Sequence, residues 1–343
     1  ENMADVGSYI LETTRDAMEK AIRDVPEGVY NHRMSTDGYD APVDIVVEMR
    51  VKDGRIALDF AGTSSISPFG INCPLTYASA YAFYGIKCVI APEIPSNHAS
   101  LSLFGISAPE NSILNPLRPA PVSARHIIGH FLPDAVMGCL EKAMPGRTLA
   151  ESGMMWNPYL RGETNFDGEH WHWEIFSLMA AGMGARSSSD GLGATAFPSA
   201  LKGMPVEAIE TIVPIVVWRK EFRADSGGAG KYRGGLGQSV EFSAISDTHL
   251  NLIAQFDRVD HPAQGRAGGC AGAAGLVKLA SGKRLNGKGR QIIPSGDRLV
   301  IDLPGGGGYG DPLERPTSEI ADDVKQGFVS TTEARRDYPQ FKG

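Results

Sequence analysis

Residues 170–174 have the types and the spacing of a metal-binding strand. They read His-Trp-His-Trp-Glu, so polar and aromatic side chains alternate. Successive side chains of a β-strand point to opposite faces, which would place His170, His172 and Glu174 on one face. Two imidazoles and a carboxylate are a ligand set that binds transition metals. The alternative is a polar strand face with Trp171 and Trp173 in the core, because the sequence shows no further ligand nearby.

His126, His130 and Asp134 form a second candidate metal set, since each lies four residues after the one before it. On an unbroken helix they would line one face. Pro133 interrupts that pattern, because proline lacks a backbone donor and clashes with the preceding turn. We therefore expect a kink or two abutting helices within residues 122–144. Histidines that are only hydrogen-bonded at a packed surface are the alternative to a metal site.

Residues 225–237 contain six glycines in thirteen positions, with Asp225, Lys231 and Arg233 between them. One interpretation is an anion-binding loop, in which backbone N–H groups face an anion. The segment lacks the Gly-x-x-x-x-Gly-Lys-[Ser/Thr] pattern of a phosphate loop, and it does not join a strand to a helix as a dinucleotide-binding loop does. The alternative is a rigid turn held by an ion pair between Asp225 and Arg233.

Residues 305–308 are four consecutive glycines. Glycine loses more backbone freedom on folding than any other residue, so such a run is kept where φ is positive or where the backbone approaches another group closely. A flexible linker is the alternative. The apolar, strand-like residues 299–303 before the run, and Tyr309 with an Asp-Pro turn after it, favour an ordered segment.

Residues 181–186 are a third segment of small side chains, and the carboxylates Glu174 and Asp190 flank it. A carboxylate beside backbone with little side-chain cover could lie next to a substrate. A buried structural carboxylate fits the same residues equally well. The chain has no Gly-x-Ser-x-Gly nucleophile motif, and no cysteine has an evident histidine partner nearby in the sequence.

Composition limits the function further. The net charge of −7 does not indicate a surface for nucleic acid or for an anionic membrane. Four scattered cysteines without a Cys-x-x-Cys motif predict reduced thiols and a cytoplasmic protein. The longest apolar run, residues 77–92, contains a lysine and is too short to cross a bilayer. The chain begins with glutamate instead of methionine, so we expect a processed or truncated piece.

The periodicity of the sequence predicts an α+β fold. Residues 3–25 have helical spacing, residues 44–51 and 55–60 form a predicted hairpin around an Asp-Gly turn, and residues 77–91 form a buried helix. From about residue 168, strand-like runs alternate with glycine-rich turns, and helices return after Pro312. These patterns predict a mixed α/β region at 1–167, a β-rich region at 168–315 and a helical tail at 316–343.

Two long glycine-rich segments, residues 225–237 and 303–313, resemble the hydantoinase B/oxoprolinase family. Shorter segments at 59–64, 71–74 and 94–97 agree with the same family. The resemblance covers nearly the whole chain. The family includes the B-type component of ATP-dependent N-methylhydantoinase, the related half of oxoprolinase, and the alpha-type subunits of acetone and acetophenone carboxylases.

The resemblance implies a subunit, or a C-terminal fragment, of an ATP-dependent cyclic-amide hydrolase. A hydantoinase A-like partner would use ATP to phosphorylate the amide oxygen of a hydantoin or lactam. The family's divalent metal is expected in an N-terminal half, on the same or a separate chain. Residues 1–60 contain only His32 as a histidine, so no residue of this chain is assigned to that metal. A ketone carboxylase subunit and a non-catalytic scaffold piece are the alternatives, and a hetero-oligomer is implied.

Within this family, Glu174 and Asp190 are the candidate catalytic residues. The residues expected to bind substrate or shape the site come from the three glycine-rich segments: Gly182, Gly184, Asp225, Gly227, Gly228, Arg233, Gly305, Gly306, Gly307 and Gly308.

Overall fold

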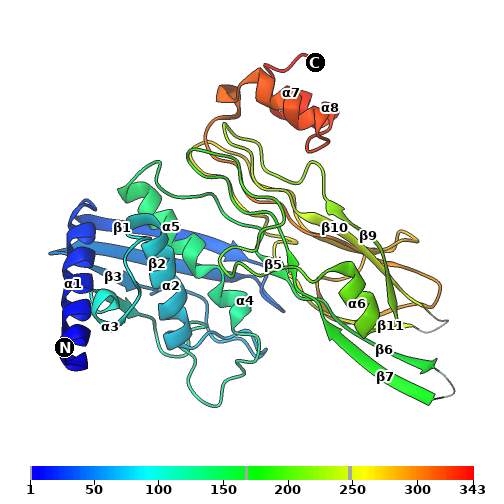
Figure 1. Cartoon of the computed structure of the whole chain (residues 1–343), viewed down its shortest axis with the longest axis horizontal. Helices are drawn as coiled ribbons and strands as arrows, with labels where there is room; N and C mark the ends of the chain where they lie inside the picture. The colour runs from blue at the N-terminus through cyan, green and yellow to red at the C-terminus, as the bar shows by residue number, and fades with distance from the viewer. Residues whose placement is uncertain (1, 167–168, 246–248) are drawn as a thin grey trace. The chain divides into compact units, whose positions relative to one another are not determined.

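The computed structural model describes residues 2–166, 169–245 and 249–343, which divide into two compact units. The first unit is Glu1–Thr148 and the second is Leu149–Gly343. Each unit has its own sheets and its own buried residues, so each is described by itself (Figure 1).

The first unit contains a four-stranded sheet of order β1-β2-β3-β4. Its strands are β1 (Gly28–Thr36), β2 (Val43–Lys52), β3 (Arg55–Asp59) and β4 (Phe104–Ser107). The β2–β3 hairpin was predicted, and Asp53 and Gly54 between the strands both have positive φ, at 50° and 68°. That conformation matches the twist of a hairpin, which explains the Asp-Gly pair there. Strand β1 was missed by the sequence prediction.

Helices of the first unit pack against this sheet and against each other. Helix α1 (Met3–Arg23) follows Asn2, whose side chain caps its first turn. It starts at the predicted residue and ends two residues before the predicted end. The other two long helices of this unit are α2 (Leu75–Ile90) and α5 (Leu132–Ala143), which contact each other. Helix α5 also contacts strands β1 and β2. Two short helices, α3 (His98–Leu101) and α4 (His126–Gly129), complete the unit.

The predicted break at Pro133 is confirmed as two helices. Helix α4 ends at Gly129, and Pro133 lies in the first turn of α5, where its missing N–H has no intrahelical partner to lose. Gly85 of α2 faces this turn, and a Cβ on Gly85 would lie 2.7 Å from the Cα of Pro133. The two helices therefore meet with almost no side chain between them.

The second unit is built from two antiparallel four-stranded sheets. One has the order β12-β14-β10-β9 and the other β13-β11-β6-β7. Their inward side chains share one core, which includes Leu160 and Leu252 from the second sheet and Phe242 and Leu299 from the first. The strands are β6 (Tyr159–Phe166), β7 (Glu169–Phe176), β9 (Ile215–Phe222), β10 (Gln238–Ala244), β11 (Leu250–Gln255), β12 (Leu276–Leu279), β13 (Lys288–Ile293) and β14 (Leu299–Asp302).

Shorter elements complete the second unit. A small ladder joins β5 (Met155–Trp156) and β8 (Met179–Ala180), and α6 (Val206–Ile212) lies against β9. A short 3₁₀ helix, Pro312–Glu314, precedes α7 (Thr317–Lys325) and α8 (Thr331–Asp337). Ser330 caps α8, because its side chain accepts a hydrogen bond from the backbone N–H of Glu333.

The α+β class is confirmed, with most helices in the first half of the chain. The boundary predicted at 167/168 falls between β6 and β7, which pair with each other along their whole length. The contacts instead divide the chain after Thr148. The tail helices α7 and α8 belong to the second unit, where Ile320, Ala334 and Tyr338 form a small core with Ala229. None of the helices in the described ranges is long and apolar enough to cross a membrane.

Candidate functional site

The glycine-rich segments of the second unit pack against each other through their backbones. The four glycines at 305–308 donate hydrogen bonds to three other segments of the unit. Gly305 N–H donates to the carbonyl of Ala273 at 3.1 Å, and Gly306 N–H to that of Gly235 at 3.0 Å. Gly307 N–H donates to the carbonyl of Glu151 at 2.9 Å, and Gly308 N–H to that of Cys270 at 2.9 Å. These amides are used inside the protein, which argues against their binding an anion.

Close approach, not positive φ, explains these glycines. None of the four has a φ in the left-handed region, but a Cβ on Gly306 would lie 2.1 Å from the carbonyl oxygen of Met183. The same holds in the other segments, where a Cβ on Gly182 or Gly184 would come within 1.9 Å of a backbone oxygen. Gly227 and Gly228 are equally confined, at 2.0 and 2.3 Å. The flexible-linker alternative is therefore wrong for this part of the chain.

Asp225 and Arg233 do not form the predicted ion pair within the described residues. The carboxylate of Asp225 accepts a hydrogen bond from the backbone N–H of Ser330 at 2.6 Å. The guanidinium of Arg233 instead contacts Asp323, with Nε 3.2 Å from the carboxylate. Both side chains thus hold the tail helices to the glycine-rich segments, so the prediction of a pair between them is wrong. The sequence did not show that the tail, about 90 residues later, supplies the partners.

Asp190 lies in an ion-pair network with two arginines. Two guanidinium nitrogens of Arg315 each donate a hydrogen bond of 2.8 Å to a different oxygen of the Asp190 carboxylate. The backbone N–H of Arg233 donates to the same carboxylate at 2.7 Å. Arg315 also contacts Asp323 at 2.8 Å. The side chains of Arg315, Arg233 and Asp323 are all less than a tenth exposed. A bidentate contact between an arginine and a carboxylate holds both side chains in one geometry.

The charge of this network determines the protonation of Asp190. Burial by itself would raise the pKa of the carboxyl, but hydrogen bonds and positive charge from Arg315 and Arg233 outweigh it and hold the pKa below its ordinary 3.8. An ionised carboxylate whose two oxygens are already occupied is a weak candidate for a proton-transfer group. This geometry favours the structural alternative for Asp190, and its catalytic role stays a prediction.

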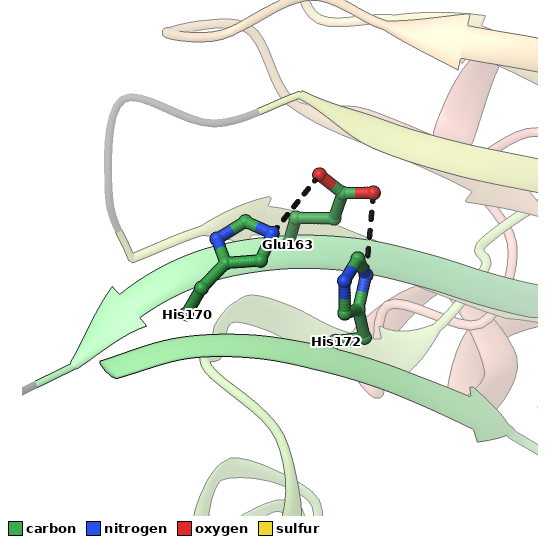
Figure 2. A group of neighbouring side chains, drawn as sticks. All are labelled: Glu163, His170 and His172. Carbon is green, nitrogen blue, oxygen red and sulfur yellow. Dashed lines mark ion pairs between the residues drawn. The ribbon is translucent and has the colours of Figure 1, made fainter.

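Glu163, His170 and His172 come together on the outer face of the β6–β7 hairpin (Figure 2). The two histidines lie two residues apart on β7, and Glu163 on β6 is the register partner of His172. The glutamate carboxylate reaches between the rings, 3.5 Å from Nε2 of His170 and 3.3 Å from Nδ1 of His172. In the described part of the chain, these three residues are the one cluster whose possible ligand atoms all lie within 4.8 Å of each other.

Glu174 is not part of this cluster. Its register partner is Arg161, whose Nε lies 3.1 Å from the glutamate carboxylate, and both side chains are largely exposed. The predicted shared face of His170, His172 and Glu174 is confirmed, but the carboxylate within reach of both imidazoles is Glu163. Trp173 is buried as predicted, but Trp171 is 42% exposed.

The sequence missed Glu163 because it missed strand β6. Gly162 weakens the strand pattern of residues 159–166. The structure explains this glycine: it is the register partner of Trp173, and a Cβ on it would lie 2.3 Å from the indole. The charged residues Arg161 and Glu163, one on each side of Gly162, were the sequence feature that could have indicated the exposed face of a strand there.

A groove of about 560 Å³ lies beside the cluster on the same sheet face. Strands β6, β7, β11 and β13 all contribute to it, through Arg161, Glu163, His172, Glu174, Asn251 and Arg290 among others. Charged side chains of both signs share the lining with the apolar Trp173 and Ile253, and the groove is open to solvent. A groove of this character suits a polar ligand held by charged groups.

His126 and His130 lie in the first unit and do not assemble a metal site with Asp134 in the described residues. The hydroxyl of Tyr81 lies 3.2 Å from Nε2 of His130. Burial, with a smaller effect of His126, lowers the pKa of His130 to about 3, and burial followed by Arg125 lowers that of His126. Both rings are therefore neutral at physiological pH, and the hydrogen-bonded alternative is favoured.

Comparison with known proteins gives a consistent assignment. A family model described as hydantoinase B/oxoprolinase matches residues 1–312. An uncharacterised protein of Methanocaldococcus jannaschii, MJ0963, is 34% identical over 87% of this chain and 52% of its own length. The putative B component of a D-/L-hydantoinase from Pseudomonas sp. is 28% identical over 96% of this chain and 58% of its own. The chain thus spans a little over half the length of these relatives.

The fold has a match among solved structures. The ATP-dependent caprolactamase of Pseudomonas jessenii superposes with a TM-score of 0.82 at 23% identity, over 97% of this chain and 60% of that one. At this level of identity the match supports the fold alone.

Proposed function

Because this chain belongs to the hydantoinase B/oxoprolinase family, we propose that it is a B-type subunit, or part of one, of an ATP-dependent cyclic-amide hydrolase. The observation that carries the proposal is the family match over residues 1–312. The putative D-/L-hydantoinase component from Pseudomonas sp., which aligns over 96% of the chain, supports it.

The proposed chemistry follows from the stability of the amide. Resonance gives the C–N bond partial double-bond character and makes the carbonyl a poor electrophile. An A-type partner that phosphorylates the amide oxygen with ATP would remove that resonance, and water could then open the ring. The family's divalent metal, placed outside this chain, would supply Lewis-acid activation of that water. No residue of this chain is assigned to it.

This chain would supply a rigid framework and polar groups near the substrate. The backbone packing around Gly305, Gly306, Gly307 and Gly308 supports the first role, because those segments cannot move apart without breaking hydrogen bonds in several directions. Glu174 is the better-placed catalytic candidate of the two predicted, since it lines an open groove, whereas Asp190 is held by Arg315.

The test is ring opening by the complete assembly. We expect the B-type protein containing this chain, purified with its A-type partner, to open hydantoin, 5-oxoproline or a simple lactam only with ATP. Glu174→Gln should lower kcat at least ~10-fold if the carboxylate takes part in proton transfer. The matched control is Glu221→Gln, which changes an exposed glutamate on β9.

The alternatives give different results in the same assay. Bicarbonate-dependent ATP use with a ketone would assign the chain to a carboxylase instead. Absence of any ATP-coupled reaction in the complete assembly would contradict the proposal. Equal activity of wild type and Glu174→Gln would remove Glu174 from the reaction and leave the family-based assignment intact.

A further inference from the structure

The cluster of Glu163, His170 and His172 has a geometry that an ordinary polar surface does not require. Antiparallel pairing sets Glu163 directly across from His172, and His170 lies on the same face two residues away. The positions of all three Cβ atoms are therefore fixed by strand hydrogen bonds. Figure 2 shows the carboxylate pointing between the two rings, with each oxygen toward a different imidazole.

One possible ligand atom from each of the three residues lies within 4.8 Å of the other two, so rotation of these exposed side chains can bring the atoms to the spacing of a metal site. Ligand atoms about 2.1 Å from a tetrahedral zinc ion lie ~3.4 Å from one another. The carboxylate oxygens of Glu163 lie 3.5 Å from His170 Nε2 and 3.3 Å from His172 Nδ1. The two imidazole rings also lie edge to face, with centroids 4.6 Å apart.

The solvent exposure of the cluster makes it accessible to an ion. The side chains of Glu163, His170 and His172 are 57%, 53% and 69% exposed. The groove lined by Glu163 and His172 opens beside them. An ion there would keep positions for water or for a ligand in the groove, as three-ligand zinc sites do.

We propose that Glu163, His170 and His172 bind a divalent transition-metal ion of the Zn²⁺ class. The two imidazoles select this class over Mg²⁺ and Ca²⁺, which prefer oxygen ligands. This site lies within the chain and is separate from the metal that the family resemblance places outside it. The proposal does not depend on the hydrolase assignment.

The test is titration of the full chain, stripped with a chelator, with Zn²⁺ alone and with Mg²⁺ alone by calorimetry. We expect saturable binding of one Zn²⁺ and much weaker binding of Mg²⁺. His172→Ala and Glu163→Gln should each weaken Zn²⁺ binding by at least ~10-fold, the lower end of the loss seen even for supporting residues of metal sites. All three side chains are exposed, so these variants should keep the fold, which circular dichroism checks.

Two control variants make the result specific. Glu174→Gln removes the carboxylate that the sequence pattern suggested, on the same face of β7, and should leave Zn²⁺ binding unchanged. His249→Ala removes an exposed histidine outside the cluster and should also have no effect. A Co²⁺-loaded chain should show visible absorption of a low-coordinate site that His172→Ala abolishes.

Three outcomes would overturn the proposal. One is the absence of saturable Zn²⁺ binding. Another is binding that His172→Ala and Glu163→Gln leave intact. The third is an equal loss in His249→Ala, which would indicate scattered surface binding by histidines.

Discussion

At the scale of single residues, Arg315 connects parts of the chain that lie far apart in the sequence. It contacts Asp190, 125 positions earlier, and Asp323 in helix α7. Its side chain is 2% exposed, so water has little access to the guanidinium if a carboxylate is lost. Removing one member of a buried ionic network leaves the remaining charges with too few partners, which costs more than the pair contributes.

We therefore predict that Arg315→Ala destabilises the second unit by about 3 kcal/mol. The variant leaves Asp323 with Arg233 alone and removes both side-chain contacts of Arg315 to Asp190. Equilibrium urea unfolding of the full chain measures the change. Lys231→Ala, which breaks an exposed ion pair with Glu314, is the control and should leave stability nearly unchanged.

The same variant should change the pH dependence of stability. The pKa of Asp190 in the folded protein is lowered, so its ionised form stabilises the fold above the ordinary value of 3.8. That contribution is lost as the pH falls through the lower folded value. The difference between wild type and Arg315→Ala should therefore narrow below about pH 4. A difference that stays constant between pH 7 and pH 3 would contradict the ionic explanation.

At the scale of elements, the glycine-rich segments form a packed layer without regular helix or strand. Segments from residues 150–153, 181–191, 226–237, 263–275 and 303–310 bond to each other. Each backbone takes the place that a side chain would fill in an ordinary core. A single added side chain must therefore displace a neighbouring backbone, which cannot move without its own hydrogen bonds.

We predict that Gly306→Val destabilises the second unit by at least ~3 kcal/mol, or prevents its folding, because its Cβ would meet the carbonyl of Met183. Soluble yield and urea unfolding measure the effect. The matched control is Gly203→Val, where the nearest atom to a new Cβ is Lys220 Nζ at 3.5 Å. A stable, folded Gly306→Val protein that has lost only ring-opening activity would instead place this glycine at the substrate.

At the scale of the whole molecule, the chain consists of two units with separate cores. The second begins at Leu149, before strands β5 and β6. Strand β6 pairs with both β7 and β11, and Leu160 from it is fully buried. A boundary at 167/168 would remove that strand from the middle of a sheet.

We predict that residues 149–343 expressed alone fold and unfold cooperatively, whereas residues 168–343 do not. The shorter fragment lacks β6 and exposes the edges of β7 and β11, which lose their shared partner. Calorimetry and circular dichroism of the two fragments make the comparison. Cooperative unfolding of both fragments, with equal enthalpy, would show that the first nineteen residues of this unit contribute little to its core.

The sequence by itself determined the fold class and the family. Helical periodicity, the Asp-Gly hairpin at Asp53 and the break at Pro133 are local features, because they depend on neighbours only a few residues away. The family came from the resemblance of the long glycine-rich motifs to those of known members. The structure explains their glycines, because close backbone approach leaves no room for a side chain.

Only the tertiary structure decided which side chains meet. Asp190 pairs with Arg315 and Arg233 with Asp323, and no local pattern encodes contacts over such separations. The carboxylate beside His170 and His172 depended on the register of a strand hidden by Gly162. A shift of one residue in pairing would move Glu163 to the other face, so the candidate metal cluster exists only through that register.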